Sequence, residues 1–157
     1  MSFHIDLKKT ELPIKGTSIT TSCQFIKDAP VFEFKGDIIN KPDWSKYNQN
    51  DLLQIGKDKY MGLSGDYDDN INHSCNPNCY LHIVGNRAFL YSLYNIRPGT
   101  EITYDYSITS TATKEDWSFN CHCGFSDCRK IISGYSYLDD ATKTHYELIG
   151  IVPYYQK

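Results

Sequence analysis

Three thiols stand within one short stretch in the last third of the sequence, at Cys121, Cys123 and Cys128. Their spacing lets all three reach a single tetrahedral ion, and zinc is the natural candidate because cysteine thiolates hold it in structural sites. A fourth ligand must then come from elsewhere in the chain. The candidates are one histidine nitrogen and three further thiols: His122, Cys23, Cys75 and Cys79.

Disulfide bonds are the competing use of the six cysteines. The start of the sequence, MSFHIDLKKTEL, mixes charges with apolar residues and has no continuous apolar stretch, so we expect no cleavable secretory signal. We therefore expect an intracellular protein, cytoplasmic or, in a eukaryotic cell, nuclear. Thiols stay reduced there, which favours metal ligands and buried thiols over a disulfide-linked extracellular binding module.

Two further segments carry polar chemistry. Residues 72–79 read Asn-His-Ser-Cys-Asn-Pro-Asn-Cys, a run that is too polar for a core strand and that contains a proline. Residues 98–106 read Pro-Gly-Thr-Glu-Ile-Thr-Tyr-Asp-Tyr, in which two tyrosines alternate with an aspartate at the end of an expected strand. Taken alone, the first segment is a turn-rich surface loop, and each tyrosine is more often a packing residue than a catalytic one.

Short strands are expected to position these segments. The clearest is a β-hairpin in which Gly85-Asn86 joins residues 79–84 to residues 87–93. Three more short strands are expected, at residues 31–34, 37–39 and 101–104. The first two-thirds of the sequence are therefore mainly β.

Polar stretches without periodicity are expected to be loops, at residues 42–51 and 64–70. Loops are where proteins usually meet their substrates. Beyond the last cysteine, Asp139 is expected to cap a short helix that runs through Tyr146 and stops at Gly150.

Composition excludes several classes of protein. A chain of 157 residues, 40% hydrophobic and 22% charged, is long enough for one core and shows no sign of disorder, so we expect one soluble domain. No apolar run approaches the roughly 20 residues that a membrane span needs. The net charge of -3 is poorly suited to neutralising phosphates, so we expect no direct nucleic acid binding and regard a basic peptide as the easier partner.

Taken in order, the three segments resemble those of the SET-domain protein lysine methyltransferases that carry a post-SET zinc loop. The matching motifs are Asn-His-Ser-Cys-x-Pro-Asn from Asn72, Pro-Gly-x-Glu-Ile-Thr-Tyr-Asp-Tyr from Pro98 and Cys-x-Cys-x4-Cys from Cys121. Upstream, residues 16–18 stand where the family has Gly-x-Gly, and residues 32–39 where it has a Glu-aromatic-x-Gly-Glu-like strand. The resemblance covers residues 15 to 134.

The resemblance implies a mainly β, β-clip-like SET fold of short strands. It also implies a knot-like C-terminal substructure, in which the Asn-His and Tyr-Asp-Tyr segments pass each other, a zinc-bound post-SET loop and a short C-terminal helix. The expected organisation has four parts. They are an N-terminal lead at 1–14, the SET domain at 15–107, the post-SET zinc loop at 117–134 and a C-terminal extension at 135–157.

The resemblance further implies where S-adenosylmethionine, the family's methyl donor, is bound. Asn72 and His73 would contact it, and the Gly-x-Gly turn would let the backbone approach its methionine end because glycine has no Cβ. Ser18 replaces the second glycine, which implies a slightly different turn. The implied cofactor-binding residues are Gly16, Thr17, Ser18, Asn72, His73 and Tyr106.

Tyr106 and Tyr104 are the implied catalytic residues. Tyr106 matches the tyrosine that holds the lysine amine and the methyl donor in line. Only the neutral amine can attack, yet free lysine has a pKa near ~10.4, so an apolar, tyrosine-lined channel must lower that pKa. Tyr104 matches the family's aromatic switch position, where tyrosine is associated with fewer methyl additions, so mainly mono- or dimethylation is expected.

The fourth zinc ligand is implied in the same way, because Cys75 matches the motif cysteine that supplies it. Cys79 is then a packed thiol. Such a bridge would pin the C-terminal segment beside the pocket, where Ile131 and Ile132 would cover the cofactor or line the lysine channel. The implied zinc ligands are Cys75, Cys121, Cys123 and Cys128.

Some positions depart from the family's pattern. Asp69 and Asn70 stand where many relatives have Arg-Phe, and Asp51 stands where many have a channel tyrosine, which Tyr47 or Tyr60 would then replace. These departures, together with Ser18, support an alternative, a catalytically weak, zinc-stabilised SET-like module for peptide binding or adaptor roles. For an active enzyme, the expected partner is a protein with an accessible lysine, and a histone tail is the family's commonest choice.

Overall fold

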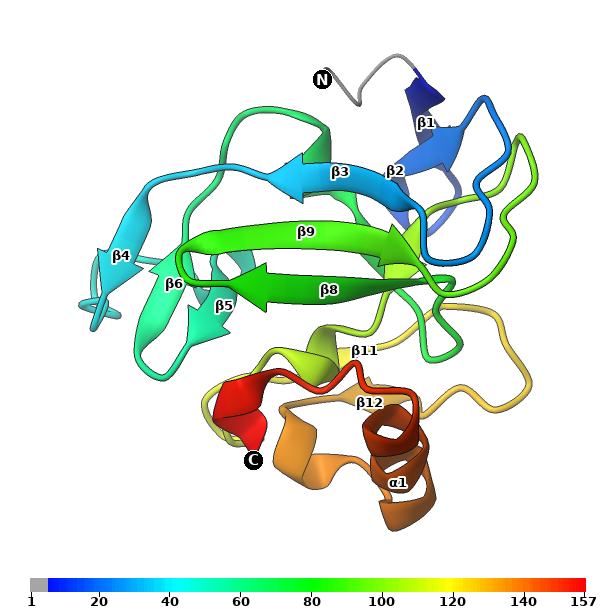
Figure 1. The fold of residues 1–157 in the computed structure, drawn as a ribbon. Coiled ribbons are helices and arrows are strands. Elements are labelled where there is room, and N and C mark those ends of the chain that lie inside the picture. The colour runs from blue at the N-terminus through cyan, green and yellow to red at the C-terminus, as the bar shows by residue number, and fades with distance from the viewer. Residues whose placement is uncertain (1–5) are drawn as a thin grey trace.

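The computed structural model describes residues 6–157, and most of its regular structure consists of short strands (Figure 1). β1 (Leu7–Leu12) and β2 (Gly16–Thr21) form an antiparallel hairpin. Two three-stranded sheets have the orders β3-β9-β8 and β4-β6-β5. Their strands are β3 (Pro30–Phe34), β4 (Ile38–Asn40), β5 (Leu53–Gly56), β6 (Lys59–Met61), β8 (Cys79–Val84) and β9 (Arg87–Ser92).

Two small strand pairs and a helix make up much of the rest. β7 (Asn72–His73) pairs in parallel with β10 (Thr103–Tyr104), and β11 (Phe119–Asn120) pairs antiparallel with β12 (Ile131–Ile132). α1 spans Asp140–Leu148. Short 3-10 turns include Gln49–Asp51, Tyr67–Asn70, Tyr106–Ile108, Tyr135–Tyr137 and Tyr154–Gln156. The predicted fold class, mainly β with a short C-terminal helix, is confirmed.

The predicted β8–β9 hairpin is confirmed, and it supplies the centre of the core. Gly85 in its turn has a φ of 60°, a left-handed conformation that glycine adopts without a Cβ penalty. Leu81 and Leu90 lie opposite each other in the ladder and are buried. β3 adds Val31 and Phe32, both almost fully buried, from the other side of β9. The consecutive Val31 and Phe32 are both buried where the β3–β9 register shifts, whereas the buried residues of β9 alternate with more exposed ones as the strand period requires.

The Asn-His segment and the Tyr-Asp-Tyr segment lie side by side, as the resemblance implies. Thr103 is opposite Asn72 and Tyr104 is opposite His73 in the parallel β7–β10 pair. The Asn78 side chain extends this pairing, since its Oδ1 accepts from the Thr103 backbone N–H at 2.9 Å. Polar side chains of residues 72–79 thus form hydrogen bonds with buried backbone groups, which allows this polar segment to pass through the interior.

The expected N-terminal lead contains β1, while residues 1–5 of that lead lie outside the described part of the chain. β1 pairs with β2 along its whole length, from Leu7 opposite Thr21 to Leu12 opposite Gly16. Residues 7–12 are thus joined by a hydrogen-bonded ladder to the strand that begins the implied SET domain. The division of the chain into four parts stays a prediction.

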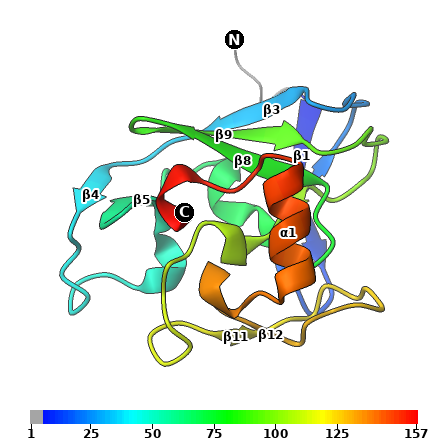
Figure 2. The same ribbon diagram turned by 60° about the horizontal axis from the view of Figure 1, so that its bottom comes forward.

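The C-terminal helix α1 begins where the sequence predicts. The Asp139 side chain accepts from the backbone N–H of Thr142 at 2.9 Å and so caps the helix. Tyr146 is the buried residue of α1, and it packs with Leu93 and Ile108 in a second apolar cluster. In Figure 2, α1 lies between the β8–β9 hairpin and the β11–β12 pair. Among residues 6–157, no helix has the length and apolar character needed to cross a membrane.

Candidate active site and metal centre

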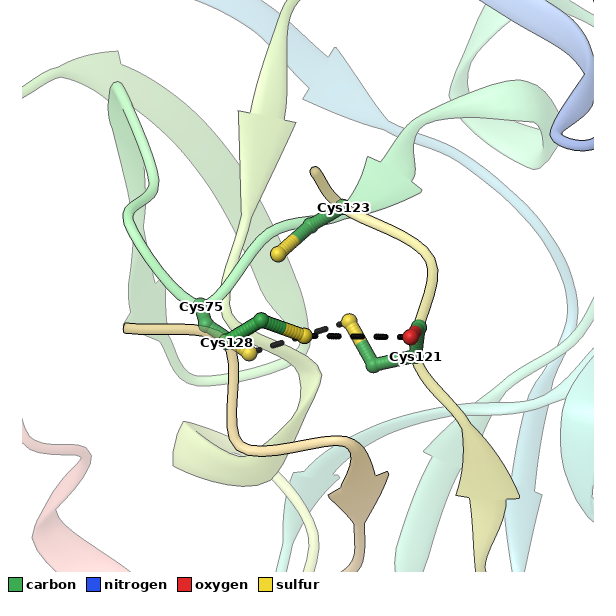
Figure 3. A group of neighbouring side chains, drawn as sticks. All are labelled: Cys75, Cys121, Cys123 and Cys128. Atoms are coloured by element: carbon green, nitrogen blue, oxygen red, sulfur yellow. Dashed lines mark hydrogen bonds between the residues drawn. The ribbon is translucent and has the colours of Figure 1, made fainter. Parts of the chain in front are cut away.

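Four thiols point toward one another: Cys75, Cys121, Cys123 and Cys128 (Figure 3). Their sulfur atoms all lie within 4.8 Å of one another, and Cys75 Sγ is 3.7 Å from Cys121 Sγ. Zinc–sulfur bonds of about 2.3 Å in a tetrahedron place the sulfurs about 3.8 Å apart, so this set of donors fits a zinc ion. The fit to zinc rests both on the thiol ligands and on the distances between their sulfur atoms.

The other candidate ligands lie elsewhere. Cys79 is almost fully buried in β8 within the main apolar core, where burial raises the pKa of its thiol. Neither Cys23 nor His122 belongs to the group of four. Cys79 is therefore a packed thiol in the described structure.

Backbone donors surround the four thiols. The Arg129 backbone N–H donates to Cys75 Sγ at 3.4 Å. Burial acts to raise the pKa of the Cys123 thiol, but hydrogen bonds from the backbone N–H groups of Phe125 and Cys75 and from the thiols of Cys128 and Cys121 together lower that pKa to about 7. Such donors favour thiolates and orient them, as the surroundings of a metal site do, while burial raises the pKa of the Cys75 and Cys121 thiols in the absence of a cation.

Both the side chain and the backbone of Tyr106 form hydrogen bonds. Its hydroxyl donates to the backbone carbonyl of Ile71 at 2.5 Å, and its backbone N–H donates to His73 Nδ1 at 3.1 Å. Burial lowers the pKa of His73 to about 4, so the ring is neutral, and its proton is then on Nε2, 3.4 Å from Cys75 Sγ. A single histidine therefore links the tyrosine backbone to the cysteine cluster.

Two cavities meet at Tyr106 and Phe119, which line both of them. The larger has a volume of about 420 Å³ and the smaller about 180 Å³. Tyr104 lies in the larger cavity, with its ring centroid 4.8 Å from that of Tyr106. Tyr106 thus lies at the boundary between the two cavities, whose other lining residues come from different segments of the chain.

The larger cavity is aromatic and acidic. Its rings include Phe34, Trp44, Tyr60 and Trp117 in addition to those above. Its carboxylates are Asp51, Asp68 and Asp69, and the cationic side chain among its lining residues is Lys35. Aromatic faces and carboxylates both attract cations, so this cavity suits a cationic side chain.

The expected channel residues divide between this cavity and other places. Tyr60 lines it, whereas Tyr47 and Asn70 do not. The carboxylate of Asp69 accepts from the backbone N–H groups of Ser64 and Gly65, at 2.9 and 2.6 Å, and so closes the loop before β7. Asp69 therefore has a local structural role at a position where the family's pattern differs.

The smaller cavity contains Asn72 and His73 from the β7 segment. The Asn72 side chain donates to Thr17 O at 3.1 Å and to Glu101 Oε1 at 3.0 Å. Lys15 also lines the cavity and forms a 2.8 Å ion pair with Glu101. The cavity is thus a polar space that also contains a cationic amine.

The implied turn at residues 16–18 lies next to this cavity without lining it. Gly16 has a φ of 70°, and a Cβ there would meet no atom within 4 Å. The Thr17 carbonyl is held by Asn72, while the buried Ser18 hydroxyl donates to Thr10 O at 3.0 Å. Ser18 thus strengthens the β1–β2 ladder, and the cofactor contacts of all three residues stay predictions.

Sequence reasoning missed the aromatic residues of the post-SET segment. Ile131 is exposed, Ile132 is buried among the cysteines, and neither lines either cavity, so that expectation is not met. Phe119 lines both cavities instead, and Trp117 donates from Nε1 to Asn50 Oδ1 at 2.9 Å. The only hint in the sequence is that two large rings stand just before the first cysteine of the loop.

A profile of the SET domain matches residues 16–107, which is more than half of the chain. The chain belongs to the SET-domain family. The resemblance read from the three motifs is therefore confirmed. Among the described elements, the match runs from β2 to the turn that holds Tyr106.

Curated relatives of this SET-domain chain are histone-lysine N-methyltransferases. The H3 lysine-36 specific enzyme of Chaetomium globosum is 28% identical over 89% of this chain and 17% of its own length. The enzyme of the same name from Emericella nidulans is 31% identical over 72% of this chain and 13% of its own length. The chain therefore spans about a sixth of the length of the first of these relatives.

Solved structures show the same fold. KRYPTONITE in complex with mCHH DNA, H3(1-15) peptide and SAH superposes with a TM-score of 0.67 at 22% identity, over 81% of this chain and 29% of that one. SUVH6 of Arabidopsis thaliana in complex with SAM gives a TM-score of 0.68 at 18% identity, over 80% of this chain and 32% of that one. At such identities the likeness establishes the fold alone.

Proposed function

We propose that this SET-domain chain is a protein-lysine N-methyltransferase that uses S-adenosylmethionine. The observation that carries the proposal is the position of Tyr106, which lines an acidic, aromatic cavity and a separate polar cavity at once. Methyl transfer by displacement needs a donor and an acceptor that approach one point from opposite sides. The names of the fungal relatives above, histone-lysine N-methyltransferases, support the same activity.

The larger cavity is the proposed acceptor site. Rings such as Trp44, Tyr60 and Trp117 would enclose the alkyl chain of a lysine, and the carboxylates would draw its ammonium group inward. Deeper in, Tyr104 is only 8% exposed, so an amine there loses most of its hydration. Desolvation lowers the pKa of an amine and leaves the neutral form that can attack.

The smaller cavity is the proposed donor site. S-adenosylmethionine, when bound, supplies a methyl group on a cationic sulfur, which the amine receives as S-adenosylhomocysteine departs. Lys15 already pairs with Glu101, so the carboxylate of such a ligand would compete with Glu101 for this cation. The amide nitrogen of Asn72 donates to Thr17 O and Glu101, which leaves its amide oxygen for polar contacts with the ligand. These groups fit the chemistry of the ligand.

The donor site is small, so its walls must move apart when the cofactor binds. At about 180 Å³, the smaller cavity is below the range of about 300–1,000 Å³ of most small-molecule sites. Its walls come from the β1–β2 turn at Ile14 and from the segment that includes Phe119 and His122. We infer that these two walls separate when the cofactor enters.

Tyr106 acts in this scheme by position. Burial raises the pKa of its hydroxyl, so the phenol stays neutral and is a poor general base at neutral pH. Its hydroxyl is held by the Ile71 carbonyl, which fixes the ring between the two cavities. Its role is therefore to align the amine with the methyl group, and the proton leaves to solvent.

Tyr104 supports mainly mono- or dimethylation. Its phenol lines the acceptor cavity beside Tyr106, where it occupies space that a growing methylammonium group would need. Histone H3 is the substrate named for the fungal relatives, which supports a basic, histone-like segment as the acceptor and a nuclear site of action. The zinc site would hold the Phe119 wall in place.

Incubation with methyl-labelled S-adenosylmethionine and a panel of basic proteins, including histone H3, tests this function. We expect label on lysine side chains, located by mass spectrometry, and its loss with Tyr106→Phe. The adaptor alternative predicts peptide binding without transfer, unchanged by Tyr106→Phe. Absence of both transfer and cofactor binding by calorimetry would contradict the proposal.

A further inference from the structure

The acceptor cavity has room for more than one side chain. Its volume of about 420 Å³ falls among sites that enclose whole small-molecule ligands, whereas lysine offers one unbranched chain that ends in an amine. Tyr104 is nearly buried, while Trp44 is 42% exposed. The space therefore extends from a deep end at the tyrosines to a mouth at Trp44.

The 3-10 turn Gln49–Asp51 presents two acceptors on the wall of this cavity. Gln49 Oε1 is buried, and no hydrogen-bond donor reaches it from residues 6–157. An unsatisfied buried acceptor destabilises the structure, so a ligand that brings a donor to it is favoured. Asp51, in the same turn, is exposed, and within the described chain its carboxylate has neither a hydrogen bond nor an ion pair.

The other two carboxylates of the cavity are already engaged. Asp68 accepts from the backbone N–H of Lys35 at 2.8 Å and from the Ser64 hydroxyl. Asp69 accepts from the backbone N–H groups that close its own loop. Gln49 and Asp51 are thus side-chain acceptors on the 44–51 side of the cavity that have no hydrogen-bond partner within residues 6–157.

Trp44 adds an aromatic face on the same side. Its ring meets that of Tyr60 edge-on, with centroids 5.2 Å apart and planes at 89°, and both rings line the cavity. A guanidinium group can stack on such a ring while it donates several hydrogen bonds in its plane. An acceptor amide, a carboxylate and an indole together match that group.

We propose that Trp44, Gln49 and Asp51 form a subsite for a second basic side chain of the substrate, in the sequence next to the target lysine. Arginine suits the subsite best, lysine less well and neutral residues poorly. The substrate class is therefore proteins in which the methylated lysine has a basic neighbour. This inference rests on the proposed methyltransferase function.

Paired peptides test the subsite. Each pair shares one target lysine and differs by arginine or alanine at a single flanking position, and kcat/KM is measured for both. We expect the arginine peptide to be favoured about tenfold or more at one position at least, which corresponds to about 1.4 kcal/mol. Asp51→Asn and Gln49→Met should each bring this ratio towards one.

Asp58→Asn is the matched control. Asp58 is an exposed carboxylate in the β5–β6 turn outside the cavity lining, and its φ of 57° is one that asparagine tolerates. The control should keep the wild-type ratio. A wild-type ratio near one at every position, or a full ratio in Asp51→Asn, would overturn the subsite.

Failure of the subsite and failure of the proposed function give different results. If no peptide is methylated, the proposed function fails. The subsite is then tested by the ratio of the Kd values of the arginine and alanine peptides, measured by calorimetry. If peptides are methylated without preference for arginine, the function stands and the subsite is wrong.

Discussion

Arg129 and Asp105 form a two-point ion pair, in which Nη1 donates to Oδ2 and Nη2 donates to Oδ1, both at 2.7 Å. Asp105 directly precedes Tyr106, and Arg129 directly follows Cys128. The pair therefore ties the cysteine loop to the tyrosine segment by a contact that needs no metal. Such two-point pairs fix both distance and orientation.

Tyr146 brings α1 into the same network. Its hydroxyl donates to Asp105 Oδ2 at 2.8 Å, and Tyr146 is nearly fully buried. Tyr146→Phe removes one hydrogen bond to a buried carboxylate, so we expect it to lower the free energy of unfolding by about 1.5–3 kcal/mol in urea titrations. Methyl transfer should also fall, since Asp105 then holds Tyr106 less firmly.

The exposed Tyr154 provides the control for that change. Tyr154→Phe should alter the free energy of unfolding by no more than about 0.5 kcal/mol. Equal effects of the two substitutions would show that the Tyr146 hydroxyl contributes nothing specific to the Asp105 network.

Zinc content should distinguish two neighbouring thiols. Cys75 lies in the group of four, whereas Cys79 is packed in the main core. We expect Cys75→Ser to lose most of its zinc and its methyl transfer, and Cys79→Ser to keep both while unfolding more easily. Elemental analysis of the purified variants measures this. Loss of zinc from Cys79→Ser alone would refute the assignment.

Tyr104→Phe should shift the products towards higher methylation. Tyr104 lines the acceptor cavity beside Tyr106, and we expect removal of its hydroxyl to leave space for a further methyl group. Mass spectrometry of one peptide over time would show more di- and trimethyl-lysine. Tyr47→Phe, at an exposed ring outside the cavity lining, should leave the product pattern unchanged. Efficient trimethylation by the wild type would contradict this account.

The rate of methyl transfer should rise with pH. Burial raises the pKa of Tyr106, so its phenol stays neutral, and the ionisation that matters is that of the substrate lysine. Below a lysine pKa of ~10.4, the neutral fraction rises about tenfold per pH unit, and log kcat/KM should follow with a slope of about one. Tyr106→Phe should be slower with the same slope. A flat profile would indicate that another step limits the rate.

Features with a local cause could be predicted from the sequence. Gly85-Asn86 between two apolar stretches specifies the β8–β9 hairpin, and Asp139 specifies the start of α1, because turn and cap chemistry act over a few residues. The cysteines of the loop are close in sequence as well. These features needed no knowledge of distant contacts.

Contacts between distant residues could not be predicted in this way. Arg129 meets Asp105, and Trp117 meets Asn50, across chain separations that leave no periodic pattern. The Tyr155 hydroxyl likewise lies 2.9 Å from the carbonyl of Gln54, which lines the acceptor cavity. The cavities depend on such contacts, so their walls emerged only from the folded chain.

We propose above that Tyr106 aligns a lysine amine with a methyl group across the boundary of two cavities. The most direct test is single-turnover transfer from bound S-adenosylmethionine to one lysine peptide, with wild type and Tyr106→Phe compared at saturating peptide. We predict transfer by the wild type and a rate about a hundredfold lower for Tyr106→Phe, as expected when alignment is lost. Equal rates for the two proteins, or no transfer by the wild type, would contradict the account.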